Sequence, residues 1–353
     1  MEFLLYCFLA TLFLLCSHFV TYKNKWIDLF VIVFMSGIFS IFTVILPYGN
    51  SDRLNYSIMF ENGTNGYIKT LDQIFTHTNY EIVYSFFILL VRNIYDIPEM
   101  FFFSISFVSI LCVLLSVYML RYRFGQCAIL LVCSWYIFLT IYSCRQMLAV
   151  GFTCLAIALF IKSKYKISLV LTLIATLIHW TAIVVFFNLL IARFVNTTLR
   201  HIIFFIFIFI SALWGFKSIY YILNHIPNLS LEISRYFDAS FAHSSLIVIK
   251  GLPYLFLSVA SIYRYTKLKQ REASIDVLLM SMYIGVWSYF AAIDMYWVYR
   301  IGFYSIFPSI LLIEKLYDRD FSIKHIKPDV AFICIVNTFI FIREMLLFYE
   351  EIL

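Results

Sequence analysis

Charged residues are scarce in this chain. They make up 13% of its 353 residues, whereas hydrophobic residues make up 63% and aromatic residues 20%. A soluble domain could not bury that much apolar surface in its own core, so the composition excludes a water-soluble globular protein and requires lipid as a solvent. We therefore predict an integral membrane protein.

The signature motifs of several soluble enzymes are also missing. The sequence has no Walker loop, no GxGxxG turn, no HExxH pair and no paired CxxC, so it gives no support for nucleotide hydrolysis, hydride transfer or structural zinc. Its eight cysteines lie in or beside apolar segments without framework spacing, which is typical of small buried hydrophobic residues. We expect no metal, no cofactor and no nucleic-acid partner.

Long apolar runs dominate what is present. The runs 3–20, 27–46 and 202–213 carry no acidic or basic residue except Asp28, which lies near one end of its run. A helix of about 20 such residues spans the roughly 30 Å of hydrocarbon in a bilayer. The first run has no basic residues before it and no small-residue cleavage site, so we interpret it as a retained helix and not as a signal peptide.

Basic residues orient the predicted helices, because loops rich in lysine and arginine stay in the cytoplasm. Under one arrangement, with both chain ends outside, all six basic clusters lie inside. These clusters are Lys23/Lys25, Arg121/Arg123, Lys162/Lys164/Lys166, Arg193/Arg200, Arg264/Lys267/Lys269/Arg271 and Lys315/Arg319/Lys324/Lys327. The arrangement requires residues 167–192 to cross twice as a hairpin that turns near His179, or to re-enter.

We accordingly predict an all-α fold: a polytopic membrane protein of about 10 to 12 transmembrane helices with short external loops. The whole chain, 1–353, is expected to form one membrane domain. Its external loops are expected at about 47–97, 220–246 and 293–300. The predicted crossings are 3–20, 27–46, 98–119, 126–143, 147–161, 167–178, 180–192, 202–219, 247–263, 275–292, 301–316 and 329–346.

Arginines predicted on the external face are informative, because membrane proteins place few basic residues there. Guanidinium groups pair two-pronged with phosphate, so such arginines are candidates for binding an anionic headgroup. Arg145 and Arg300 are expected at tight turns between helices. The candidates are Arg145, Arg300 and Arg235. The alternative is an anchor to lipid headgroups, or a salt bridge to Asp52, Glu81 or Asp294.

Carboxylates and aromatic rings accompany these arginines in the external loops. Carboxylates accept hydrogen bonds from sugar hydroxyls, and aromatic rings stack on the apolar faces of pyranoses. The candidate sugar-binding rings are Tyr56, Tyr84 and Tyr236. An aromatic-belt position is the alternative for Tyr56 and Tyr84. From Glu81 to Arg92 the chain is helix-compatible but short and charged, so we interpret it as an interfacial or re-entrant helix.

His179 lies in the middle of the apolar stretch 167–192, where the topology places an external turn. A lone histidine in lipid usually forms a hydrogen bond to a neighbouring helix. On the same side as Arg145 and Glu81, however, it is also a candidate base or sugar ligand. Both interpretations stay open.

Four short motifs, taken in order, resemble the EpsG/Wzy group of bacterial polysaccharide polymerases. The likeness spans roughly residues 45 to 190, with a weaker echo in Arg235-Tyr236 and Tyr299-Arg300. The motifs are Gly49-x-x-Asp52-x-x-x-Tyr56, the Glu81 and Tyr84 pair at the start of a short helix, Arg145-Gln146-x-Leu148-Ala149, and Leu177-Ile178-His179-x-Thr181-Ala182.

The resemblance implies an inverting, metal-independent glycosyltransferase at the external face of the bacterial inner membrane. It would transfer a growing glycan from undecaprenyl diphosphate to a new lipid-linked repeat unit, in the synthesis of O-antigen, capsule or exopolysaccharide. Arg145, Arg300 and Arg235 would stabilise the leaving diphosphate. The base would be Glu81, with His179 second and Asp52 third. The implied partners are undecaprenyl-diphosphate-linked oligosaccharides, membrane lipids, a chain-length regulator and a flippase.

Two other classes of protein stay open. A flippase for lipid-linked glycans would need a cationic cavity that reaches both membrane faces, and the sequence has few ionisable residues in mid-membrane apart from Asp276 near the inner edge. A ligase-type transferase for O-antigen would carry a large external loop between late helices, and 227–245 is short for that role.

Overall fold

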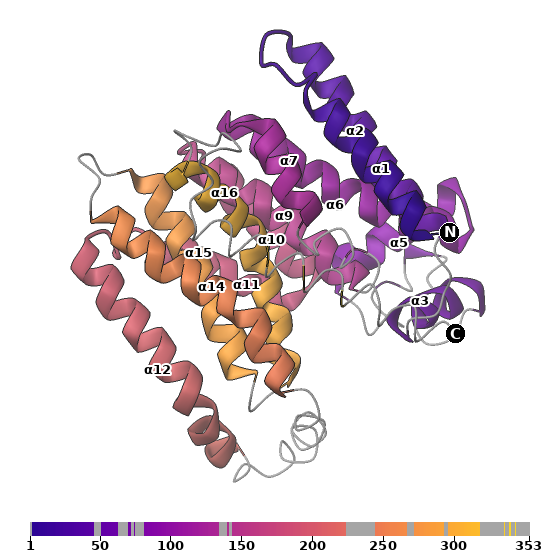
Figure 1. Ribbon diagram of the computed structural model, residues 1–353. Coiled ribbons are helices and arrows are strands. Elements are labelled where there is room, and N and C mark those ends of the chain that lie inside the picture. Colours follow the sequence, from indigo (N-terminus) through magenta and orange to yellow (C-terminus); the bar gives the residue numbers. More distant parts are fainter. Residues whose placement is uncertain are drawn as a thin grey trace. The chain divides into compact units, whose positions relative to one another are not determined.

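Helices make up the regular structure of the part of the chain that is described (Figure 1). The computed structural model describes residues 2–45, 51–62, 70, 71, 74, 81–133, 140, 143–223, 244–266, 272–292, 296–317, 335, 339 and 343. No strand occurs among these residues, and the all-α prediction is confirmed. The chain divides into two compact units, Met1–Phe186 with Thr338–Leu353 and Phe187–Asn337, and each is treated separately below.

Unit 1 is built on four helices, α2, α6, α9 and α10. Each contacts the next: α2 contacts α6, α6 contacts α9, and α9 contacts α10. The α-helices that lie wholly within the described part of this unit are α1 (Glu2–Ser17), α2 (Lys25–Ile45), α3 (Ser51–Asn62), α5 (Ile82–Ile94), α6 (Pro98–Leu120), α7 (Phe124–Cys133), α9 (Cys144–Ile161) and α10 (Tyr165–Ile178). Helix α5 extends about 20 Å at 1.5 Å per residue, which is shorter than the hydrocarbon layer. The interfacial or re-entrant placement of this helix stays a prediction.

The boundaries of α6 and α9 follow from local chemistry. Pro98 begins α6, where its missing N–H costs nothing. Helix α9 ends in a Schellman motif: Lys164 N–H donates to Leu159 O at 2.8 Å and Ser163 N–H donates to Phe160 O at 2.9 Å. Ser163 adopts the required left-handed conformation with φ 59°. The motif reverses the chain within a few residues, so α9 and α10 form an antiparallel hairpin.

The apolar stretch 167–192 breaks at His179, as expected. His179 has an extended backbone with φ −153° and ψ 114°, which ends α10. The 3-10 helix η1 (Trp180–Ala182) follows, and α11 (Ile183–Ile191) continues from it. The helix break at His179 is therefore confirmed, whereas a double crossing or a re-entrant course of 167–192 stays a prediction.

Unit 2 is built around α15 (Ala273–Ala291), which packs against the helices that surround it in the described part of this unit. These are α12 (Thr198–Leu223), α14 (Ser244–Tyr265), η2 (Tyr296–Ser305) and α16 (Ile306–Tyr317). A Cβ on Gly285 would lie 2.8 Å from the Ser305 side chain, so a glycine is needed for the close approach of η2. The prediction of one α-helix over 301–316 is wrong in its first part, because residues 296–305 form a 3-10 helix.

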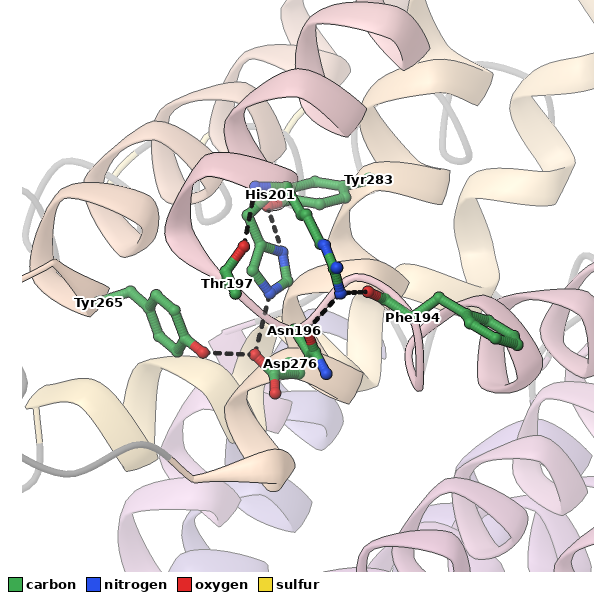
Figure 2. A network of polar contacts seen from close by, with 8 residues as sticks. Phe194, Asn196, Thr197, His201, Tyr265, Asp276 and Tyr283 are labelled. Carbon is green, nitrogen blue, oxygen red and sulfur yellow. Dashed lines mark hydrogen bonds and ion pairs between the residues drawn. The ribbon is translucent and has the colours of Figure 1, made fainter.

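A buried polar network joins α12, α14 and α15 within unit 2 (Figure 2). Asp276 Oδ1 lies 2.9 Å from His201 Nε2 and accepts a hydrogen bond from the Tyr265 hydroxyl at 2.7 Å. His201 Nδ1 lies 3.1 Å from the Tyr283 hydroxyl. All four side chains are buried. Asp276 is thus an anchored member of a helix-packing network.

Four helices in the described ranges are long and apolar enough to cross a membrane. They are α2, α6, α9 and α15, and shorter apolar helices accompany them. Large apolar side chains such as Phe30, Phe207 and Trp214 are exposed on helix surfaces, as a lipid environment permits. The chain is a multi-pass membrane protein.

Candidate active site

Glu81 joins three elements of unit 1 through its carboxylate. One oxygen, Oε2, accepts a hydrogen bond from Nη1 of Arg145 at 2.9 Å, and the two groups form an ion pair. The other oxygen, Oε1, accepts a hydrogen bond from the backbone N–H of Trp180 at 3.1 Å. Glu81 precedes α5, Arg145 lies in α9 and Trp180 begins η1. The contact therefore brings together residues that lie far apart in the sequence.

The position of Arg145 favours anion binding. It lies in the first turn of α9, which begins at Cys144, and the positive end of the helix dipole attracts negative charge there. The side chains of Arg145 and Glu81 retain 23% and 18% of their accessible surface. Both groups therefore keep some accessible surface, although each is largely enclosed by protein.

Close packing against α6 holds the start of α9. The Ser109 hydroxyl donates a hydrogen bond to the Met147 carbonyl at 2.7 Å, and Met147 N–H donates to Ser143 O at 2.8 Å. A Cβ on Gly151 would lie 2.9 Å from the Ser109 backbone, so the two helices touch through small residues. Arg145 is thus carried on a rigid element.

An aromatic cluster lies next to Arg145. The Arg145 guanidinium carbon is 5.9 Å from the centroid of the Tyr84 ring, within the range of a cation–π contact. Tyr84 is fully buried, and its ring packs edge-on against Tyr56 and Phe101 at centroid distances of 6.3 and 6.2 Å. Tyr56 is only partly buried. Sugar stacking by the two tyrosines stays a prediction, and the burial of Tyr84 favours a role in supporting Arg145.

Two further arginines, which the sequence analysis did not select, lie in the same cluster of rings. Arg53 is fully buried, with its guanidinium carbon 4.5 Å from the centroid of Phe102. The Arg92 guanidinium lies 4.4 Å from the ring of Phe60, donates to that residue's carbonyl, and its Nε is 3.4 Å from Asp96 Oδ1. Their positions in the predicted external loop were the sequence signal that could have identified these two arginines as candidates.

His179 lies at the same end of the α9 and α10 hairpin as the Glu81–Arg145 pair, because it precedes Trp180 directly. Its Nδ1 is 2.6 Å from the Thr181 hydroxyl, and the residue is 8% exposed. The structure thus gathers Glu81, Arg145 and His179 at one end of unit 1. The side chain of Asp52, and all of Arg235 and Tyr236, lie outside the described residues.

Arg300 belongs to unit 2 and is partly buried. It lies within the 3-10 helix η2, so the prediction of a tight turn at this residue is wrong. Its neighbour Tyr299 has Nζ of Lys250 6.0 Å from its ring centroid, and Lys250 is itself buried. Lys250 was not selected from the sequence, although a lysine inside the apolar run 247–263 was a signal of an unusual environment.

The helices and the site together define a multi-pass membrane protein with a partly exposed acid and arginine pair near the end of a helical hairpin. The sequence model of the EpsG family matches residues 29–351, which is most of the chain, and the chain belongs to this family. The family is associated with polymerase-type, glycosyltransferase-like steps of polysaccharide biosynthesis. No curated protein and no solved structure matches the chain.

Proposed function

We propose that this protein polymerises lipid-linked repeat units at the external face of the bacterial inner membrane. The donor would be a growing glycan on undecaprenyl diphosphate, and the acceptor would be a hydroxyl of a new lipid-linked unit. The observation that carries the proposal is the meeting of Glu81, Arg145 and the His179 turn at one end of unit 1. A membrane transferase needs this combination of a cation and a base.

Arg145 would bind the diphosphate of the donor. Negative charge develops on the leaving diphosphate as the glycosidic bond breaks, and a fixed guanidinium stabilises that charge more than it stabilises the ground state. The dipole of α9 adds to this effect. The arginine would supply the positive charge that a metal ion supplies in other transferases, and Arg300 and Arg235 are the further candidates for this role.

Glu81 would accept the proton of the acceptor hydroxyl. The acceptor oxygen forms a bond to the anomeric carbon while the bond from that carbon to the diphosphate oxygen breaks. The leaving lipid diphosphate keeps the electron pair, and the hydroxyl proton passes to the carboxylate. A single displacement of this kind inverts the anomeric configuration. His179 and then Asp52 are the alternative bases, and Tyr56 and Tyr236 are candidates for stacking on the sugars.

The proposal is tested by the surface glycan of cells that lack this gene and are complemented with wild type or Arg145→Gln at matched membrane abundance. The expected result with Arg145→Gln is single repeat units without longer rungs on the glycan ladder. Arg200→Gln is the matched control, because it removes the same charge from an exposed arginine whose Nη1 donates to Asn196 and Phe194 O. The control is expected to give a normal ladder.

Two outcomes contradict the proposal. A normal ladder with Arg145→Gln would remove this residue from the reaction. Loss of even the single repeats in cells without the gene would indicate flipping or ligation instead of polymerisation.

The repeat-unit donor, a flippase and a chain-length regulator would be the partners of the polymerase.

A further inference from the structure

The two groups that the proposed reaction uses are bound to each other in this structure. Arg145 Nη1 donates to Oε2 of Glu81, and the Trp180 N–H donates to Oε1, so both oxygens of the carboxylate already accept a hydrogen bond. These hydrogen bonds occupy one of the two lone-pair positions on each oxygen and hold the carboxylate in the orientation that Arg145 and the Trp180 N–H set. The arginine, in turn, already holds an anion.

The Glu81 carboxylate occupies a position on Arg145 that a phosphate oxygen would take. Carboxylate and phosphate can both accept two hydrogen bonds from the planar guanidinium group. A diphosphate carries more negative charge and more acceptor oxygens than a carboxylate. Because the pair keeps part of its surface exposed, solvent screens its attraction and a stronger anion can displace it. The bond to Trp180 does not involve Arg145, so it can survive that displacement.

We propose that the Glu81–Arg145 contact is a substrate-operated lock on the base, an inference that rests on the proposed function. The lipid diphosphate of the donor binds the Arg145 guanidinium and displaces Oε2 of Glu81 from it. The Trp180 N–H keeps Oε1 in place, so the carboxylate is released toward the acceptor hydroxyl without leaving the site. The base therefore becomes available only after the donor has bound, which orders the two substrates.

The lock predicts that Glu81 competes with the diphosphate. The experiment measures the dissociation constant of farnesyl diphosphate, a short lipid diphosphate, for the full-length protein in nanodiscs. Glu81→Gln is expected to tighten binding by about fivefold, the size expected for loss of a competing, partly exposed ion pair. Glu81→Ala is expected to tighten binding as well. Glu99→Gln is the matched control, because Glu99 is an acid in the first turn of the next helix, and it is expected to leave binding unchanged.

The Arg145 and Glu81 variants together distinguish a failure of the lock from a failure of the proposed function on which it rests. Arg145→Gln is expected to weaken binding at least about tenfold, and Glu81→Gln is expected to have no further effect in that background. If Arg145→Gln weakens binding but neither Glu81 variant tightens it, Glu81 only positions the arginine and the lock is wrong, whereas the diphosphate site stands. If Arg145→Gln leaves binding unchanged, both the lock and the proposed role of Arg145 are wrong.

Discussion

Gly151 of α9 packs directly against Ser109 of α6: a Cβ at position 151 would come 2.9 Å from both Cα and O of Ser109. The obstacle is backbone, which cannot rotate away as a side chain can. Arg145 lies in the first turn of the same helix, and the Ser109 hydroxyl donates a hydrogen bond to the Met147 carbonyl. The contact thus links helix packing in unit 1 to the geometry of the candidate site.

Gly151→Ala is expected to lower the free energy of unfolding by about 1–3 kcal/mol, because one added methyl group must push two helices apart. Gly37→Ala is the control, since a Cβ on Gly37 in α2 would meet nothing within 4 Å and alanine favours a helix. Thermal unfolding of the purified protein in detergent measures both. Equal melting temperatures for the two variants would show that α6 and α9 are less closely packed than the structure indicates.

Substitutions of Tyr84 test whether its ring helps to hold the Arg145 guanidinium in place. Tyr84→Leu is expected to reduce polymerisation, because it removes a cation–π contact of about 0.5–2 kcal/mol. Tyr84→Phe keeps the ring and is expected to retain most of the activity. Polymer length from membranes of matched protein content is the measurement. If Tyr84→Phe is as inactive as Tyr84→Leu, the hydroxyl and not the ring is the group that matters.

Glu81 and His179 can be separated as candidate bases by single substitutions. Glu81→Gln is expected to lower the rate of glycan transfer by about 10²–10⁴-fold, the usual contribution of a general base. His179→Asn is expected to have the smaller effect, because the Nδ1 of His179 is already engaged with Thr181. Rates are compared at saturating donor, so that a change in diphosphate affinity does not enter. A larger loss with His179→Asn would transfer the role of base to the histidine.

The network around Asp276 makes a prediction about stability alone. Asp276→Ala removes the carboxylate oxygen that His201 and Tyr265 share. Leaving these two buried polar groups unsatisfied is expected to cost about 2–6 kcal/mol. Tyr265→Phe removes one hydrogen bond and is expected to cost about 0.5–1.5 kcal/mol. Chemical denaturation in detergent distinguishes the two values. A cost of less than about 1 kcal/mol for Asp276→Ala would show that water replaces the carboxylate at this site.

The sequence by itself determined the class of the protein and much of its helical pattern. Lipid cannot satisfy backbone hydrogen bonds, so a long apolar run must form a helix. Hydropathy therefore predicts the ends of such a helix closely: a crossing over 98–119 was predicted, and α6 is Pro98–Leu120. The break at His179 was also predicted, because the basic residues on either side of the stretch 167–192 required a turn. The short motifs indicated the EpsG family, which the match over residues 29–351 confirms.

Only the tertiary structure decided which side chains meet. The pairing of Glu81 with Arg145 was one of several alternatives in the sequence, and it depends on how α5, α9 and η1 pack. Hydropathy does not encode that packing, because in lipid the apolar faces of helices are nearly interchangeable and small contacts such as Gly151 with Ser109 select the neighbours. The burial of Tyr84 was beyond the sequence pattern for the same reason: a tyrosine near the predicted membrane surface is equally compatible with exposure and with burial, and the choice depends on which helices surround it.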